Sequence, residues 1–120
     1  RPILAGLYRA AAATVVPSLY EQGSFPILEA IRCGCPAVAS DIPAFREAFV
    51  AFDGAIPMFD PYSPESIASV VAEVLVDRAA VQYRQALALP TRSWDDAASD
   101  WLAVLCEASS AKARPEPSLA

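Results

Sequence analysis

Glu21 and Glu29 are the residues of this chain whose type and spacing could do chemistry. Seven residues separate them, among them Gly23, Ser24 and Phe25, which directly precede a proline suited to a first helical turn. Backbone N–H groups at a helix start favour a bound phosphate, and an ionised carboxylate accepts hydrogen bonds from hydroxyl groups. The spacing alone is weak evidence, because Glu21 is more simply explained as a solvated loop charge and Glu29 as an acid near a helix start.

A strand, a helix and a second strand are predicted to position these residues. The β-branched run from Thr14 to Ser18 fits a buried strand, and the helix that starts at Pro26 ends where Gly34 can adopt a left-handed conformation. The run from Ala37 to Ser40 is the second strand. Such a unit has parallel strands and a right-handed crossover, and the loop after its first strand lies where α/β sheets bind ligands.

The rest of the chain continues the alternation of strands and helices. Ser63 is predicted to cap a helix, because a proline and an acid follow it and apolar residues then recur with helical spacing. Asp41 is predicted to cap a short helix, a role that we favour over a ligand contact. This order predicts an α/β fold with a parallel sheet and helices on both faces. The other expected elements are helices over 3–8, 44–49 and 79–89, a strand over 55–59 and a final helix from Ser93.

The expected final helix carries Trp94 and Trp101 on one apolar face, and Asp96 follows Ser93 by three residues, as in a capping box. Two tryptophans at helical spacing are more often part of a core than a platform for a sugar. From Ser109 onward the composition is typical of a disordered tail. We therefore expect one domain over residues 1–108 and a tail over 109–120.

The bulk properties exclude several classes of protein. The 120 residues are 55% hydrophobic and 19% charged, which fits one globular domain, and the net charge of −5 argues against a nucleic-acid surface. No apolar run reaches the roughly 18 residues that span a bilayer and no signal-peptide pattern is present, so we expect a cytoplasmic protein without a transmembrane segment. Cys33, Cys35 and Cys106 are expected to be reduced thiols, and the absence of histidine removes the commonest zinc ligand.

The stretch around the two glutamates resembles the glycosyl transferases group 1 family, which comprises retaining glycosyltransferases of the GT-B fold. The matching segments occur in order along the chain. They are PSLYE, Gly23, PILEA, CGCP, VASDIP and the pair Arg46-Glu47, followed more weakly by FDPYSPES and the Trp94 segment. Ser24 departs from the pattern, because the family most often has a second glycine there. The resemblance covers most of the chain and implies the later part of the Rossmann-like C-terminal domain of a GT-B enzyme.

The resemblance implies transfer of a sugar from a nucleoside-diphosphate sugar to an acceptor, with retention of configuration and without a metal or cofactor. The family's paired glutamates fall on Glu21 and Glu29, which would contact hydroxyls of the transferred sugar and of the ribose, respectively. Glu21 is thus the candidate catalytic residue, and we favour a polar contact over a covalent role. Gly23, Ser24 and Phe25 would bind the diphosphate or the donor sugar through their backbone.

The chain opens at Arg1 and is too short for the two Rossmann-like domains of a GT-B enzyme, so we expect a fragment that is inactive alone. An acceptor glycan, lipid or small molecule would bind through a missing N-terminal domain, and peripheral attachment to a membrane is compatible with this arrangement. In that case the tryptophan face of the final helix should be exposed. The open alternatives are a non-catalytic GT-B-like scaffold and a GT-B-fold nucleotide-sugar epimerase. A receiver-type signalling domain is disfavoured, because no lysine precedes Lys112.

Overall fold

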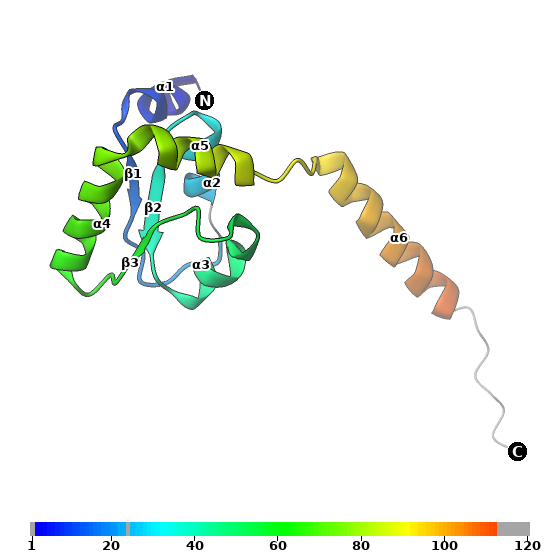
Figure 1. Ribbon diagram of the computed structural model, residues 1–120. Coiled ribbons are helices and arrows are strands. Elements are labelled where there is room, and N and C mark those ends of the chain that lie inside the picture. The colour runs from blue at the N-terminus through cyan, green and yellow to red at the C-terminus, as the bar shows by residue number, and fades with distance from the viewer. Residues whose placement is uncertain (1, 24, 113–120) are drawn as a thin grey trace, which may run out of the picture. The chain divides into compact units, whose positions relative to one another are not determined.

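The computed structural model describes residues 2–23 and 25–112, in which helices and strands alternate (Figure 1). The chain divides into two compact units, Arg1–Leu89 and Pro90–Ala120, which are described separately. The elements of the first unit are α1 (Pro2–Ala10), β1 (Thr14–Val16), α2 (Phe25–Arg32), β2 (Ala37–Ser40), α3 (Pro43–Ala48), the 3-10 helix η1 (Val50–Phe52), β3 (Met58–Phe59), α4 (Pro64–Val76) and α5 (Arg78–Ala88).

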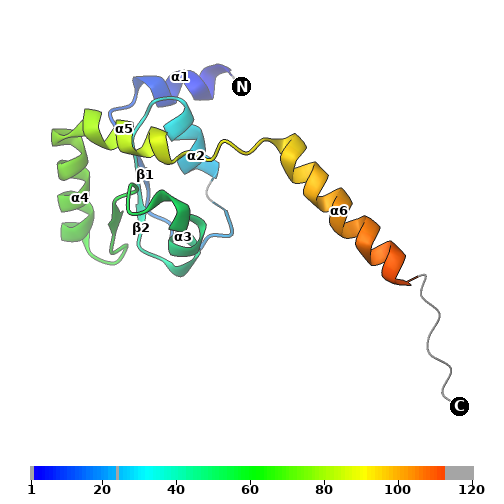
Figure 2. The same ribbon diagram turned by 45° about the vertical axis from the view of Figure 1, so that its right-hand side comes forward.

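The three strands form a parallel sheet in the order β1-β2-β3. Val15 lies opposite Val38 across the first pair of strands, and Ser40 lies opposite Phe59 across the second. Figures 1 and 2 show α4 on one side of the sheet and α2 with α3 on the other. These features confirm the predicted α/β fold, with its parallel sheet flanked by helices.

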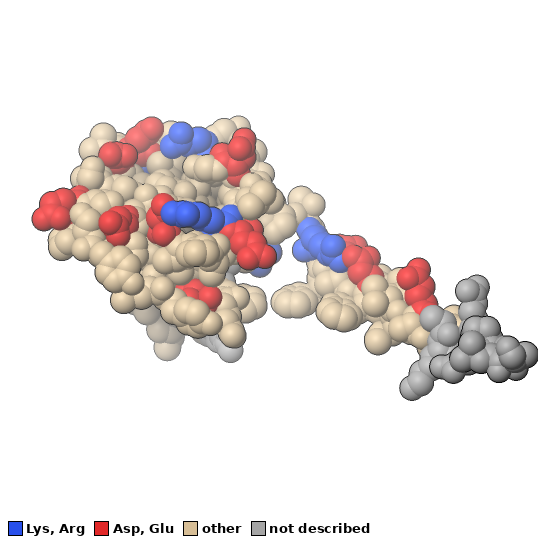
Figure 3. Space-filling view, turned by 90° about the horizontal axis from the view of Figure 1, so that it is seen from below, with Lys and Arg blue, Asp and Glu red and all other residues tan. Residues whose placement is uncertain are grey.

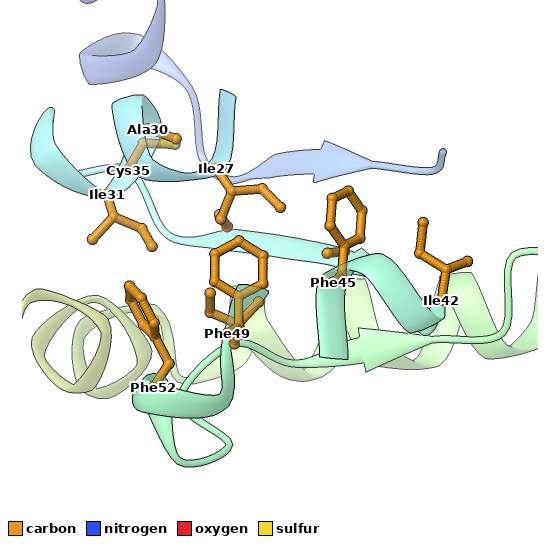
Figure 4. Packing of buried hydrophobic residues seen from close by; sticks show 11 residues of the cluster. Ile27, Ala30, Ile31, Cys35, Ile42, Phe45, Phe49 and Phe52 are labelled. Carbon is orange, nitrogen blue, oxygen red and sulfur yellow. The ribbon is translucent and has the colours of Figure 1, made fainter. Parts of the chain in front are cut away.

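Two clusters of buried apolar side chains hold the helices to the sheet. The larger cluster joins Ala37 and Ala39 of β2 to α2, α3 and η1, and three phenylalanine rings fill its centre (Figure 4). The ring centroids of Phe45 and Phe49 are 5.9 Å apart, and those of Phe49 and Phe52 are 5.3 Å apart in an edge-to-face arrangement. Aromatic pairs at these separations contribute about 0.5–1.5 kcal/mol beyond the burial of their area.

The smaller cluster packs α4 and α5 against the opposite face of the sheet. Successive side chains of a strand point to opposite faces, so Val38 leaves the larger cluster and joins Phe59, Val74 and Val81. All four side chains of β2 are buried, and all are small. Because these side chains are both small and buried, helices can pack closely on both faces of the central strand.

Gln85 of α5 takes the place of a neighbouring strand at the amino end of β2. The pairing of β3 with β2 starts only at Ala39, so the Ala37 backbone has no strand partner on that side. The Ala37 N–H donates to Gln85 Oε1 at 2.9 Å, and Gln85 Nε2 donates to the Ala37 carbonyl at 2.6 Å. Gln85 is 0% exposed. Because buried backbone polar groups need hydrogen-bond partners, the Gln85 side chain supplies to Ala37 the partners that a neighbouring strand would otherwise supply.

The predicted signals at two helix ends are confirmed. Ser63 caps α4, because its Oγ accepts a hydrogen bond from the Ser66 N–H at 3.1 Å. Gly34, two residues after α2, has φ +77°, the left-handed conformation expected of a glycine that ends a helix. The Ala11 and Ala12 carbonyls after α1 accept hydrogen bonds from Arg78, a favourable place for a cation at a helix carboxyl end.

Asp41 is not the cap of α3 that the sequence predicts. Ile42 occupies the N-cap position, and no side chain of the described residues bonds there. Asp41 instead accepts two hydrogen bonds from Arg46, from Nε to Oδ1 at 2.5 Å and from Nη2 to Oδ2 at 2.8 Å. A two-point, charge-assisted pair is stronger than a single bond to a backbone N–H, which explains the outcome.

Several predicted boundaries also shift, and the helices expected over 3–8, 44–49 and 79–89 span 2–10, 43–48 and 78–88. β1 ends at Val16, because Pro17 has no N–H to continue the ladder and Ser18 belongs to the loop. β3 is confined to Met58 and Phe59, since Pro57 interrupts the longer run expected from residue 55. The helix expected from Pro26 begins one residue earlier, at Phe25.

The second unit contains α6 (Trp94–Lys112). Its predicted capping box is confirmed: the Asp96 N–H donates to Ser93 Oγ at 3.1 Å, and the Ser93 N–H donates to Asp96 Oδ2 at 2.8 Å. Trp94 and Trp101 are 82% and 68% exposed within this chain, as expected for the tryptophan face of the final helix without a partner domain. None of the helices in the described part of the chain combines the length and apolar character needed to cross a bilayer.

The first four residues of the tail predicted over 109–120 belong to α6. α6 continues through residues 109–112, because the sequence Ser-Ser-Ala-Lys contains no helix breaker and the next proline is Pro115. The rest of the predicted tail, residues 113–120, lies outside the described residues.

Candidate functional site

The carboxyl ends of the parallel strands lie at one edge of the sheet, where the loop after β1 carries Glu21. This edge is the lower one in Figure 1, and Figure 3 shows it from below. Acidic side chains are spread over the face seen there. Asp41 and Asp60 directly follow β2 and β3. In parallel α/β sheets this edge is where ligands bind.

Glu21 is half-buried and is held by a residue of its own loop. Ser18 Oγ donates a hydrogen bond to Glu21 Oε1 at 2.9 Å. The other carboxylate oxygen, Oε2, accepts no hydrogen bond from the described residues. The side chain is therefore fixed near the end of β1 with one oxygen available to a hydroxyl group of a ligand.

Glu29 lies on α2 and faces α1, where it meets a tyrosine. The Tyr8 hydroxyl donates to Glu29 Oε2 at 3.3 Å, and both side chains are half-buried. Burial, reinforced by the nearby Glu29 charge, raises the pKa of Tyr8 above its ordinary value. The phenol thus stays protonated and remains a donor to the carboxylate at neutral pH.

An open pocket of about 230 Å³ adjoins this pair between α1 and α2. Tyr8 and Glu29 supply polar groups to a lining that is otherwise largely apolar. Whole small ligands usually occupy pockets of roughly 300–1,000 Å³, so this one matches part of a ligand, such as one sugar ring. Its other lining residues are Leu4, Ala5, Arg32 and Cys33.

The start of α2 lies between the two glutamates in sequence. Phe25 is its first residue, and the ring is 65% exposed. A Cβ added to Gly23 would come only into ordinary contact, 3.7 Å from the Phe25 ring, and the glycine is not in the left-handed region. Ser24 lies outside the described residues. Phe25 is thus at the amino end of an eight-residue helix, while the backbone around the predicted phosphate site is described only in part.

The Asp41–Arg46 pair brings a guanidinium group to the same edge of the sheet. Ser40, the residue before Asp41, donates from Oγ to the Val16 carbonyl at 3.3 Å, which ties this segment to the end of β1. Arg46 holds the pKa of Asp41 below its ordinary value. Among the described residues, no group of histidine, cysteine, aspartate and glutamate is arranged to hold a metal ion.

Sequence reasoning singled out both glutamates as candidates but missed Ser18 and Tyr8, which hydrogen-bond to them. Ser18 lies three positions from Glu21, and Pro17 directly before it was the signal in the sequence that could have placed it in the loop. Tyr8 lies 21 positions from Glu29, and only the packing of α1 on α2 brings the two together. The glutamates therefore have different hydroxyl donors, supplied by different elements.

The parallel sheet with helices on both faces defines an α/β domain, with polar side chains where its strands end. Comparison with known proteins gives the family. The sequence model of glycosyl transferases group 1 matches residues 3–93, and the chain belongs to this family.

Curated relatives agree with that family. The chain is 38% identical over 71 residues to O-antigen chain mannosyltransferase B of Escherichia coli, a match that covers 59% of this chain and 18% of the relative. It is 35% identical over 86 residues to a serotype-specific mannosyltransferase of Escherichia coli, covering 72% and 10%, respectively. It is 38% identical over 77 residues to D-inositol 3-phosphate glycosyltransferase of Thermobispora bispora, covering 64% and 18%. The matched region is thus less than a fifth of each of these relatives. No solved structure gives a significant match.

Proposed function

We propose that this chain supplies part of the donor site of a retaining glycosyltransferase of the GT-B fold, which transfers a sugar from a nucleoside-diphosphate sugar to an acceptor. The observation that carries the proposal is the family match over residues 3–93, which includes Glu21 in the loop after the first strand of the parallel sheet and Glu29 on the helix that follows. The acceptor, a glycan, lipid or small molecule, would bind through a domain outside this chain. We place the protein in the cytoplasm.

Glu29 is the proposed ribose ligand. Tyr8 occupies one position at Oε2, so Oε1 and the remaining lone pair of Oε2 stay available to two vicinal hydroxyl groups. Each hydrogen bond from a hydroxyl to a charged carboxylate contributes about 1.5–3 kcal/mol. The adjoining pocket gives this carboxylate an open approach.

Glu21 is the proposed catalytic residue. Transfer develops positive charge at the anomeric carbon of the sugar and negative charge on the departing diphosphate. A carboxylate fixed by Ser18 counters the positive charge and orients a sugar hydroxyl without forming a covalent bond. The leaving oxygen of the diphosphate can then assist the acceptor on the same face, which retains the configuration.

The backbone of Gly23, Ser24 and Phe25 is proposed to bind the diphosphate or the donor sugar at the start of α2. An N-terminal position on a helix favours an anion by about 0.3–2 kcal/mol. This is too little to hold a diphosphate by itself, and the net charge of −5 works against it. We therefore propose that basic residues outside this chain complete the site and that no metal takes part.

The test compares glutamate variants of the full-length protein in donor binding and transfer, with nucleoside diphosphates of uracil, guanine and adenine and their sugar conjugates. Mannose conjugates come first, since two relatives are named mannosyltransferases. Glu29→Ala should weaken nucleotide binding by about 10-fold or more. Glu21→Gln should lower kcat and leave nucleotide affinity unchanged. Glu73→Ala, which removes an exposed glutamate of α4 outside the segments that resemble the family, is the matched control.

The outcomes separate the competing functions. Absence of donor binding and of transfer in the wild type as well as in both glutamate variants would mean a scaffold rather than an enzyme, whereas wild-type binding and turnover in both variants would refute the roles proposed for the two glutamates. Conversion of a nucleotide sugar to its epimer, without transfer, would identify an epimerase. The 120-residue chain alone should transfer no sugar, and measurable transfer by it would overturn the view that it holds only part of the site.

A further inference from the structure

Among the described residues, Tyr8 is the one side chain from another element that hydrogen-bonds to either glutamate. It reaches Glu29 from α1, across the interface between α1 and α2, with 3.3 Å between the phenol oxygen and Oε2. The hydroxyl group of Ser18, by comparison, belongs to the loop that already carries Glu21. The orientation of Glu29 therefore depends on a separate helix.

The hydrogen bond between Tyr8 and Glu29 lies where a ligand can reach it. The carboxylate and the phenol both line the open pocket between α1 and α2, so a ligand can reach them. Arg32, one turn along α2, lines the same pocket. The ion pairs of the described residues are Asp41–Arg46 and Arg92–Asp100, so Arg32 does not neutralise Glu29 there. The hydroxyl group of Tyr8 is the one hydrogen-bond donor that the Glu29 carboxylate has among the described residues.

We propose that Tyr8 is a positioning residue for donor binding, whose hydroxyl group fixes the Glu29 carboxylate for contact with the ribose of a nucleoside diphosphate. The inference rests on the ribose role of Glu29 proposed above. A glutamate on a helix surface has three rotatable side-chain torsions, and binding must otherwise pay to order them. A hydroxyl donor that occupies one oxygen before the ligand arrives reduces this ordering cost and leaves Oε1 for the ribose.

The experiment measures the affinity of the full-length protein for two ligands, a ribonucleoside diphosphate and its 2′,3′-dideoxy analogue. Four forms are compared: wild type, Tyr8→Phe, Glu29→Gln and the double variant. Tyr83→Phe, on an exposed tyrosine of α5, is the matched control. Tyr8→Phe keeps the aromatic ring and its packing on α2. Both ligands are measured on the same variant, so any partial loss of fold affects them equally.

Tyr8→Phe is expected to weaken binding of the ribonucleotide about three- to tenfold, where tenfold corresponds to about 1.4 kcal/mol. Binding of the dideoxy analogue should change less than about twofold, since it lacks the hydroxyl groups that Glu29 would contact. In the Glu29→Gln background, Tyr8→Phe should weaken ribonucleotide binding much less than it does in the wild type, because the two residues act through one contact.

Two results would overturn the positioning role of Tyr8 while leaving the donor site intact. One is an unchanged ribonucleotide affinity in Tyr8→Phe alongside a clear loss in Glu29→Gln. The other is an equal loss for both ligands, which would mean that Tyr8 only supports the fold. If Glu29→Gln itself binds the ribonucleotide as well as the wild type does, the ribose role of Glu29 fails and the positioning role fails with it.

Discussion

Replacing Gln85 by alanine should strongly destabilise this fold. The side chain is fully buried, and both ends of its amide bond the backbone of Ala37. In the variant, a buried N–H and a buried carbonyl lose their partners. Each unsatisfied group costs about 1–3 kcal/mol, so we expect a loss of about 2–5 kcal/mol in the free energy of unfolding.

That loss is a large fraction of the roughly 5–15 kcal/mol that stabilises a typical domain. For a domain of this size, about 1 kcal/mol shifts the melting temperature by about 4–8 °C, so the midpoint should fall by at least about 8 °C. The assay is thermal and urea unfolding of the chain followed by circular dichroism. Gln82→Ala is the matched control, because Gln82 lies one turn earlier on the same helix and is only half-buried.

Gln85→Glu sharpens the test. A carboxylate can accept from the Ala37 N–H but cannot donate to the Ala37 carbonyl, and burial disfavours its charge. The carboxyl pKa in the folded variant should therefore lie above its value in the unfolded chain. Stability relative to the wild type should be greatest at low pH and fall as the pH rises above about 4.3. A loss below about 1 kcal/mol in Gln85→Ala would refute the strand-replacing role.

Three further predictions concern the rest of the chain. Gly34→Ala should lower the free energy of unfolding by about 1–2 kcal/mol, because φ is +77° there. Gly6→Ala, in the open middle of α1, should leave it unchanged or raise it, and urea unfolding of both variants tests the contrast. The lowered pKa of Asp41 means that its pair with Arg46 stabilises the fold above about pH 3.9 and is lost as the pH falls through the lower folded-state pKa. The unfolding free energy of Asp41→Asn should thus be slightly below that of the wild type at pH 7, and this difference should shrink at pH 3. An equal difference at both pH values would contradict the prediction. In single-cysteine variants treated with a thiol reagent, the exposed Cys106 should react first. The buried Cys35 should react last, at the rate at which the fold opens.

The local signals in the sequence predicted the framework because each depends on residues close together in the chain. The apolar spacing of α4, the cap at Ser63 and the glycine after α2 each require only a few neighbouring residues. The alternation of strands and helices then leaves a parallel sheet as the natural arrangement. The same local signals failed at Asp41, where a cap competed with an ion pair to a residue five positions away.

Contacts between distant residues could not be read from the sequence. Gln85 is a polar residue in a weak helical pattern, and nothing local indicates that it completes a strand 48 positions earlier. The bond from Tyr8 to Glu29 depends in the same way on how α1 packs on α2. The glutamates themselves were found only because the segments around them resemble a family, since their spacing carries little information by itself.

The two candidate carboxylates lie outside both clusters of buried side chains. Selection for folding therefore acts mainly on β2, the phenylalanines and the faces of α2 and α4, while selection on ligand choice acts on the loop after β1 and the outward side of α2. Substitutions at the exposed positions beside Glu21 and on the outward side of α2 leave the buried Ile27, Ala30 and Ile31 untouched, so they should have little effect on stability. If the proposed donor site is correct, such a domain can change its ligand by mutation while its architecture persists, and a library randomised only at these exposed positions should retain a high proportion of folded members.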